Sequence, residues 1–201
     1  MKRALFLMYG QPEGGMTNVD RQLGNTGLVD FADLYELDAL ALPDYAAVFV
    51  SMHVDQRYLA THADMIDRYL RQGGTVVANG HIAYPFLRDL TAFTPLRDYN
   101  VDDLRVKRQT PHPVWDGVAE LELTFRRGVA GFYGRGGHQP PAGATVVHTI
   151  GARGLTVDFA YPVGRGRVLF HGGNDLWQFG NAKDTTARIV PQLFEWIYAK
   201  G

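Results

Sequence analysis

The chain has 201 residues, of which 46% are hydrophobic and 20% are charged. This length and apolar content suit one sizeable domain with a continuous core, so we expect residues 1–201 to form a single domain. The 20 basic and 21 acidic residues give a formal net charge of −1, which offers no electrostatic attraction for nucleic acid or an anionic membrane. The chain has no cysteine, which excludes disulfides, thiolate metal sites and a cysteine nucleophile.

The start of the chain predicts a buried first strand over Arg3 to Tyr9, because a compact apolar run ends at a Gly-Gln-Pro turn. This run is too short for a signal peptide or a membrane span, so we expect a cytoplasmic protein. The Gly-interrupted segment that follows predicts a short helix near Val19 to Leu23. A second strand is expected near Asp33 to Leu37.

The next segment predicts a strand, a helix and a parallel strand. Ala46 to Met52 is rich in β-branched and aromatic residues, which favours a strand. Asp55 is a suitable N-cap for a long amphipathic helix that ends at Gly73. Thr75 to Asn79 then predicts a strand parallel to the preceding one, because a crossover helix returns the chain to the same edge of the sheet.

The second half of the chain is richer in turn residues. We interpret Thr91 to Pro141 as an inserted or edge β region of the same domain, in which the sequences LRVKRQ and ELELTFRR suggest antiparallel strands. Three further strands are expected at Ala144 to Ile150, Leu155 to Phe159 and Arg167 to His171, with a tight hairpin turn before the last of them. A closing helix is expected over Ile189 to Ile197.

Three predicted strands end in histidine, at His53, His81 and His171. If these strands are parallel, the three side chains share one edge of the sheet, where ligands of open α/β sheets bind. Histidine suits proton transfer near neutral pH, and neutral imidazole also binds divalent metals. Because no short metal-ligand motif is present, we expect a polar pocket with no metal and no cofactor. The alternative is that each histidine only hydrogen-bonds a loop carbonyl.

Other residues near the predicted strand ends are candidate ligand contacts. The backbone amides near Gly10 and Gly80 could polarise an oxygen, and Asp175 could orient a histidine. Trp177 could stack on a sugar or planar ring, or equally seal the core. Nucleotide binding is not favoured, since neither a GxGxxG nor a Walker pattern is present. The remaining candidate ligand contacts at these ends are Tyr9, Gln11, Asn79 and Asn174.

The order of several motifs resembles the class I glutamine amidotransferase-like superfamily, and most closely its trehalose-utilisation-like (ThuA-like) branch. The motifs are DYAAVFVSM, RQGGTVVANGH, HPVWDGV, the Pro141 to Gly143 turn and GRGRVLFHGGND, so the likeness runs from about Asp44 to the end. It implies a flavodoxin-like, three-layer α/β sandwich with a mostly parallel central sheet and a smaller antiparallel region.

The resemblance also implies roles for individual residues. The nucleophile elbow falls at Asn79, Gly80 and His81, and because no cysteine is present the thioester chemistry of a glutaminase is excluded. His171 matches the catalytic histidine. The family's glutamate position is Gly173 here, and the nearest carboxylate is Asp175, so an intact triad is not expected.

Two hypotheses follow. In the first, His81 and His171 transfer protons, with Asp175 as a third catalytic residue, on a carbohydrate-like or carbonyl compound in a small-molecule-handling protein of carbohydrate metabolism. In the second, the chain is a non-catalytic amidotransferase-like module whose Thr91 to Pro141 region binds a protein partner or another copy of itself.

Overall fold

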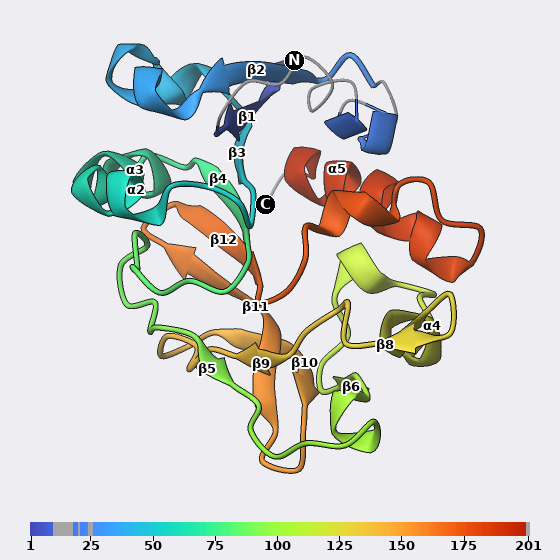
Figure 1. The fold of residues 1–201 in the computed structure, drawn as a ribbon. Coiled ribbons are helices and arrows are strands. Elements are labelled where there is room, and N and C mark those ends of the chain that lie inside the picture. The colour runs from blue at the N-terminus through green and yellow to red at the C-terminus, as the bar shows by residue number, and fades with distance from the viewer. Residues whose placement is uncertain (10–17, 20, 24–25, 200–201) are drawn as a thin grey trace.

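The computed structural model describes residues 1–9, 18–19, 21–23 and 26–199. Its centre is an eight-stranded sheet with the order β2-β1-β3-β4-β12-β11-β10-β6 (Figure 1). Neighbouring strands from β2 to β12 pair in parallel, whereas β11, β10 and β6 continue the sheet in antiparallel pairs. The strands are β1 (Ala4–Met8), β2 (Val29–Asp33), β3 (Ala47–Val50), β4 (Thr75–Asn79), β6 (Lys107–Arg108), β10 (Thr145–Ile150), β11 (Leu155–Val163) and β12 (Gly166–His171).

Apolar side chains from the two faces of this sheet form two separate clusters. Leu5 and Leu7 of β1 join the cluster that contains residues of α2 (Gln56–Thr61) and α3 (Ala63–Arg71). Ala4, Phe6 and Met8 of the same strand join the cluster that contains α5 (Ile189–Tyr198). All five residues of β1 are buried, which explains why its sequence is continuously apolar. Figure 1 shows α2 and α3 on one side of the central strands and α5 on the other.

The helix expected after Asp55 is present, but it is divided at His62 into α2 and α3. The Asp55 side chain accepts hydrogen bonds from the backbone amides of Arg57 and Tyr58, as an N-cap does. Gly73, with a φ of 106°, follows the last turn of α3, where a residue with a side chain would be strained.

Two predictions of local structure are wrong. The second strand is β2 (Val29–Asp33) rather than Asp33 to Leu37, because the Asp33 side chain accepts from the Tyr35 amide and starts a 3-10 helix over Leu34–Ala39. The ELELT sequence forms one helical turn, α4 (Glu120–Thr124), rather than a strand. In that turn the Thr124 hydroxyl donates to the Glu120 carbonyl.

The remaining elements are short. Two small antiparallel sheets pair β5 (Thr94–Pro95) with β9 (Gly136–Gly137) and β7 (Phe125–Arg126) with β8 (Val129–Ala130). Further 3-10 helices cover Leu42–Asp44, Asp102–Leu104, Pro113–Trp115, Leu176–Phe179 and Thr185–Arg188. The expected helix near residue 19 lies partly outside the described residues, although Asn18, Val19, Arg21 and Gln22 are helical. Across the described part of the chain, no helix combines the length and apolar character that a membrane crossing requires.

Candidate functional site

The carboxyl ends of β4 and β12 lie side by side, because these two strands are neighbours in the parallel part of the sheet. Gly80 follows β4 with a φ of 110°, and a Cβ there would lie 2.8 Å from the Met52 Cα. Its backbone amide donates to the His171 carbonyl at 2.9 Å. The turn after β4 therefore requires glycine, and it presents His81 beside the end of β12.

His171, the last residue of β12, is completely buried and paired with Asp158 of β11. The two residues are direct partners in the strand register, and 2.6 Å separates His171 Nδ1 from Asp158 Oδ1. Burial alone would raise the pKa of the Asp158 carboxyl, but the charge of His171 and the hydrogen bonds from His148 and His171 hold that pKa well below its ordinary range. Asp158 is therefore an ionised carboxylate that orients the His171 ring.

Asp158 is also bound by two further buried side chains. The Tyr133 hydroxyl donates to Asp158 Oδ2 at 2.6 Å, and His148 Nδ1 lies 2.8 Å from the same oxygen. On the far side of His148, Arg108 Nε donates to Nε2 at 3.2 Å. The carboxylate thus accepts from three donors, which offset the cost of burying its charge.

A third histidine, His138, joins His81 and His171 at this edge, and we call these three side chains the histidine cluster. His138 is 3% exposed, and its Nδ1 lies 2.9 Å from the Thr91 carbonyl. His81 stacks on Phe93 with ring centroids 3.9 Å apart, and the Phe93 ring lies 5.5 Å from that of His138. The cluster therefore combines residues from the ends of β4 and β12 with one from the loop before β10.

Electrostatics favour neutral imidazoles at two members of the cluster, His81 and His138. Partial desolvation lowers the pKa of His81, and the nearby His138, His171 and Arg135 side chains lower it further because they disfavour a second positive charge. Burial also lowers the pKa of His138, which the carbonyls of Thr91 and Gly80 oppose only in part. At neutral pH His81 is therefore ready to accept a proton.

Two ring nitrogens of the cluster are buried without a partner among the described residues, His138 Nε2 and His171 Nε2. The Gly172–Gly173 turn lies against both rings. A Cβ on Gly172 would be 3.4 Å from His138 Cδ2, and one on Gly173 would be 2.7 Å from His171 Nε2. These unpaired nitrogens mark the point where a ligand could form hydrogen bonds.

Asp175, expected to orient a histidine, instead binds the two residues that follow β3. Its Oδ1 accepts from the Met52 amide at 2.7 Å and its Oδ2 from the Ser51 hydroxyl at 2.8 Å. Burial raises the pKa of Asp175 despite these two hydrogen bonds. The acidic partner of His171 is Asp158, which the sequence analysis missed.

Three other predicted contacts have structural partners. The Asn79 side chain donates to the Val50 carbonyl and accepts from the Leu176 amide. The Gly80 amide is bonded to His171, as described above. Trp177 is 1% exposed and packs on Phe6 with ring centroids 5.1 Å apart. It therefore seals the core, which is one of the two alternatives that the sequence left open.

The remaining predicted contacts lie outside the cluster or outside the described residues. Tyr9 is 52% exposed and packs near Tyr35. His53 is exposed, and Asn174 is half-buried. Gly10 and Gln11 lie outside the described residues. Among the described residues, no group of three or more His, Asp or Glu side chains is placed to hold a metal ion.

Comparisons with known proteins show the fold. No protein-family model matches the sequence, and no curated protein matches it. A cytoplasmic protein from Salmonella typhimurium has a similar structure, with 16% identity and a TM-score of 0.65 over 98% of this chain and 100% of that chain. A second cytoplasmic protein, from Salmonella typhimurium LT2, has 12% identity and a TM-score of 0.54 over 97% and 96% of the two chains.

The same fold also occurs as part of a larger chain. The GH42 beta-galactosidase Gan42B from G. stearothermophilus matches 98% of this chain with 30% of its own, at 13% identity and a TM-score of 0.53. At these identities the likeness is to the fold alone.

Proposed function

We propose that this protein is a cytoplasmic, amidotransferase-like protein with a flavodoxin-like sandwich that handles a small polar compound by histidine-mediated proton transfer. The observation that carries the proposal is the Asp158–His171 pair, whose unpaired Nε2 lies at the β4–β12 edge beside a glycine turn that presents His81. The compound is carbohydrate-like or contains a carbonyl group, and the protein is not a glutaminase because it has no cysteine.

The arrangement supplies an acid and a base. Asp158 fixes His171 with Nδ1–H toward the carboxylate, so Nε2 is the nitrogen that exchanges a proton with a ligand. His171 Nε2 accepts a proton from a carbon or hydroxyl of the ligand and, once protonated, returns it to another atom of the ligand, while His81, with a lowered pKa, is a second neutral acceptor. Because His171 Nε2 is buried, binding must open the side chains around it.

A thermal-shift screen of sugars, keto-sugars and amides tests the proposal. A ligand at a hundredfold excess over its Kd contributes ~2.7 kcal/mol, which raises the Tm of a domain of this size by very roughly 5 to 10 °C. We expect one class of compound to produce this shift in the wild type and in His53→Ala, but not in His81→Ala. An equal shift in all three proteins would contradict the proposal.

A second function, a protein-interaction module, is favoured by a different observation. Leu121, Val129 and Phe132 in the Thr91 to Pro141 region are 61%, 51% and 43% exposed. Such apolar side chains commonly lie at interfaces, and the beta-galactosidase match places the same fold within a larger chain. If this function is correct, Val129→Asp with Phe132→Asp will abolish self-association or partner binding in sedimentation experiments. Unchanged association in that double variant would argue against it.

A further inference from the structure

A line of polar residues crosses the interior of the sheet from β6 to β12. Arg108 pairs with His148, His148 with Asp158, and Asp158 with His171 in the registers of successive neighbouring strands. His148, Asp158 and His171 are each 0% exposed. Burying polar side chains on four adjacent strands of an apolar sheet costs free energy. The hydrogen bonds between these residues offset that cost.

We propose that Arg108 and His148 are positioning residues that set the proton arrangement of the Asp158–His171 pair. Arginine can only donate, so the Arg108 Nε–H requires His148 Nε2 to be an acceptor. The proton of His148 must then be on Nδ1, from which it donates to Asp158 Oδ2. Asp158 Oδ1 is left for His171, whose Nδ1 carries the proton and whose Nε2 faces away from the carboxylate.

Other neighbours of this line support the same arrangement. The Tyr133 hydroxyl donates to Asp158 Oδ2 and lies 3.5 Å from His148 Nδ1, so its single proton is directed at the carboxylate and not at His148. The Trp115 ring packs edge-on against His148, with ring centroids 5.3 Å apart. His112 lies on the same side, and its pKa is lowered to about 4 mainly by burial, so it adds no charge at neutral pH.

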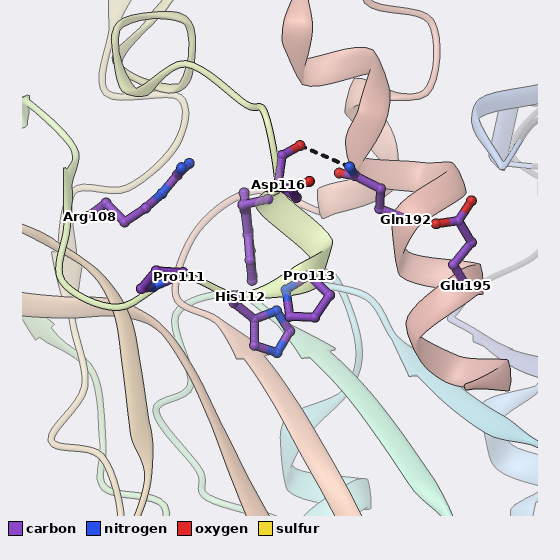
Figure 2. Close-up of a pocket in the computed structure, with 8 residues that line it drawn as sticks. Arg108, Pro111, His112, Pro113, Asp116, Gln192 and Glu195 are labelled. Carbon is purple, nitrogen blue, oxygen red and sulfur yellow. Dashed lines mark hydrogen bonds between the residues drawn. The ribbon is translucent and has the colours of Figure 1, made fainter. Parts of the chain in front are cut away.

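The Arg108 end of the line lies at a cavity. Arg108 lines a cavity of about 450 Å³ together with His112, Asp116, Gln192 and Glu195. Figure 2 shows Arg108 and His112 on one side of this cavity and Gln192 and Glu195 of α5 on the other. Arg108 is anchored there by a hydrogen bond from Nη2 to the Val118 carbonyl at 2.8 Å. The line therefore runs from this cavity through His148 and Asp158 to His171 of the histidine cluster.

Histidine NMR tests the inference without any ligand. Long-range ¹H–¹⁵N spectra of the wild type at pH 7 should show His148 protonated at Nδ1 only and His171 protonated at Nδ1. A His148 protonated at Nε2 in the wild type would overturn the proposal, and this measurement needs no variant.

Variants then test the role of Arg108. In Arg108→Met, His148 loses the donor at Nε2, so the ¹⁵N signal of that nitrogen should move toward the position of an acceptor without a hydrogen bond while the fold is retained. Arg105→Met is the matched control, because Arg105 pairs with exposed Asp102 three residues away and should leave His148 unchanged. An unchanged His148 Nε2 signal in folded Arg108→Met would contradict the proposal. Proton transfer by His171 belongs to the proposed function, whereas the tautomers measured by these spectra do not depend on it. The tautomer assignment and the proposed function can therefore fail separately.

Discussion

The substitution Asp158→Asn tests the buried pair most severely, because the amide is nearly isosteric with the carboxylate but carries no charge. Three donors reach the carboxylate, from Tyr133, His148 and His171. A hydrogen bond to a charged group contributes roughly 1 kcal/mol more than one between neutral groups. Loss of the charge at all three bonds should therefore lower the free energy of unfolding at pH 7 by about 3 kcal/mol.

The same substitution should reverse the tautomer of His171. The amide oxygen can still accept from Tyr133 and His148, but the amide NH₂ then faces His171 and donates to Nδ1. The ring proton moves to Nε2, which removes the acceptor that faces the histidine cluster. This change is visible in ¹H–¹⁵N spectra and does not depend on activity.

Urea unfolding followed by tryptophan fluorescence measures the stability change, since Trp115, Trp177 and Trp196 are all buried. The control is Asp102→Asn, a carboxylate whose side chain is 78% exposed and which should change stability by less than about 0.5 kcal/mol. Our reasoning is refuted if Asp158→Asn lies within about 1 kcal/mol of the wild type and His171 keeps its proton on Nδ1.

Acid should weaken the protein through the same carboxylate. The folded-state pKa of Asp158 is depressed, so its contribution to stability is complete above the ordinary carboxyl pKa of about 3.9 and is lost as the pH falls below that value.

Three further predictions concern other residues. The pKa of His112 is lowered to about 4, so the unfolded chain binds a proton below about pH 6.5 that the folded protein does not; up to roughly 3 kcal/mol should be lost as the pH falls to 4. In pH-dependent urea unfolding, His112→Gln should reduce this loss, and His53→Gln should not. Trp177→Ala should lower the free energy of unfolding, measured by calorimetry, by about 3 to 5 kcal/mol, because it leaves a cavity in the core. A loss of under about 1 kcal/mol would instead indicate a surface position. Gly80→Ala should cost at least about 2 kcal/mol, given its φ of 110° and the contact with Met52, and a wild-type Tm would show that the turn is not strained.

Much of the parallel sheet could be predicted from the sequence, because its strands are short apolar runs bounded by turn residues. The same pattern predicted that His53, His81 and His171 end strands at one edge of the sheet. His81 and His171 lie at the ends of β4 and β12, whereas β3 ends at Val50 and His53 is exposed beyond it. The prediction of a strand at ELELT was wrong. Its alternating leucines would share one face of a strand, but on one helical turn Leu121 is exposed and Leu123 is buried.

The partners of His171 could not be predicted, because they depend on which distant strands pair. Asp158 lies opposite His171 across a hairpin, and His148 reaches Asp158 from the next strand over. The available signal was a single charged residue inside the apolar strand LTVDFAYPV, which is costly unless it is paired. His138 had no comparable signal, since it precedes β10 in a loop whose course is set by tertiary packing.

The most direct test of the central claim is histidine NMR of the wild type as the best compound from the thermal-shift screen is added. If the proposed site is correct, the imidazole ¹⁵N signals of His81, His138 and His171 will shift together. His62, at the junction of α2 and α3, will not. Saturable binding that leaves the three cluster signals unchanged would contradict the account.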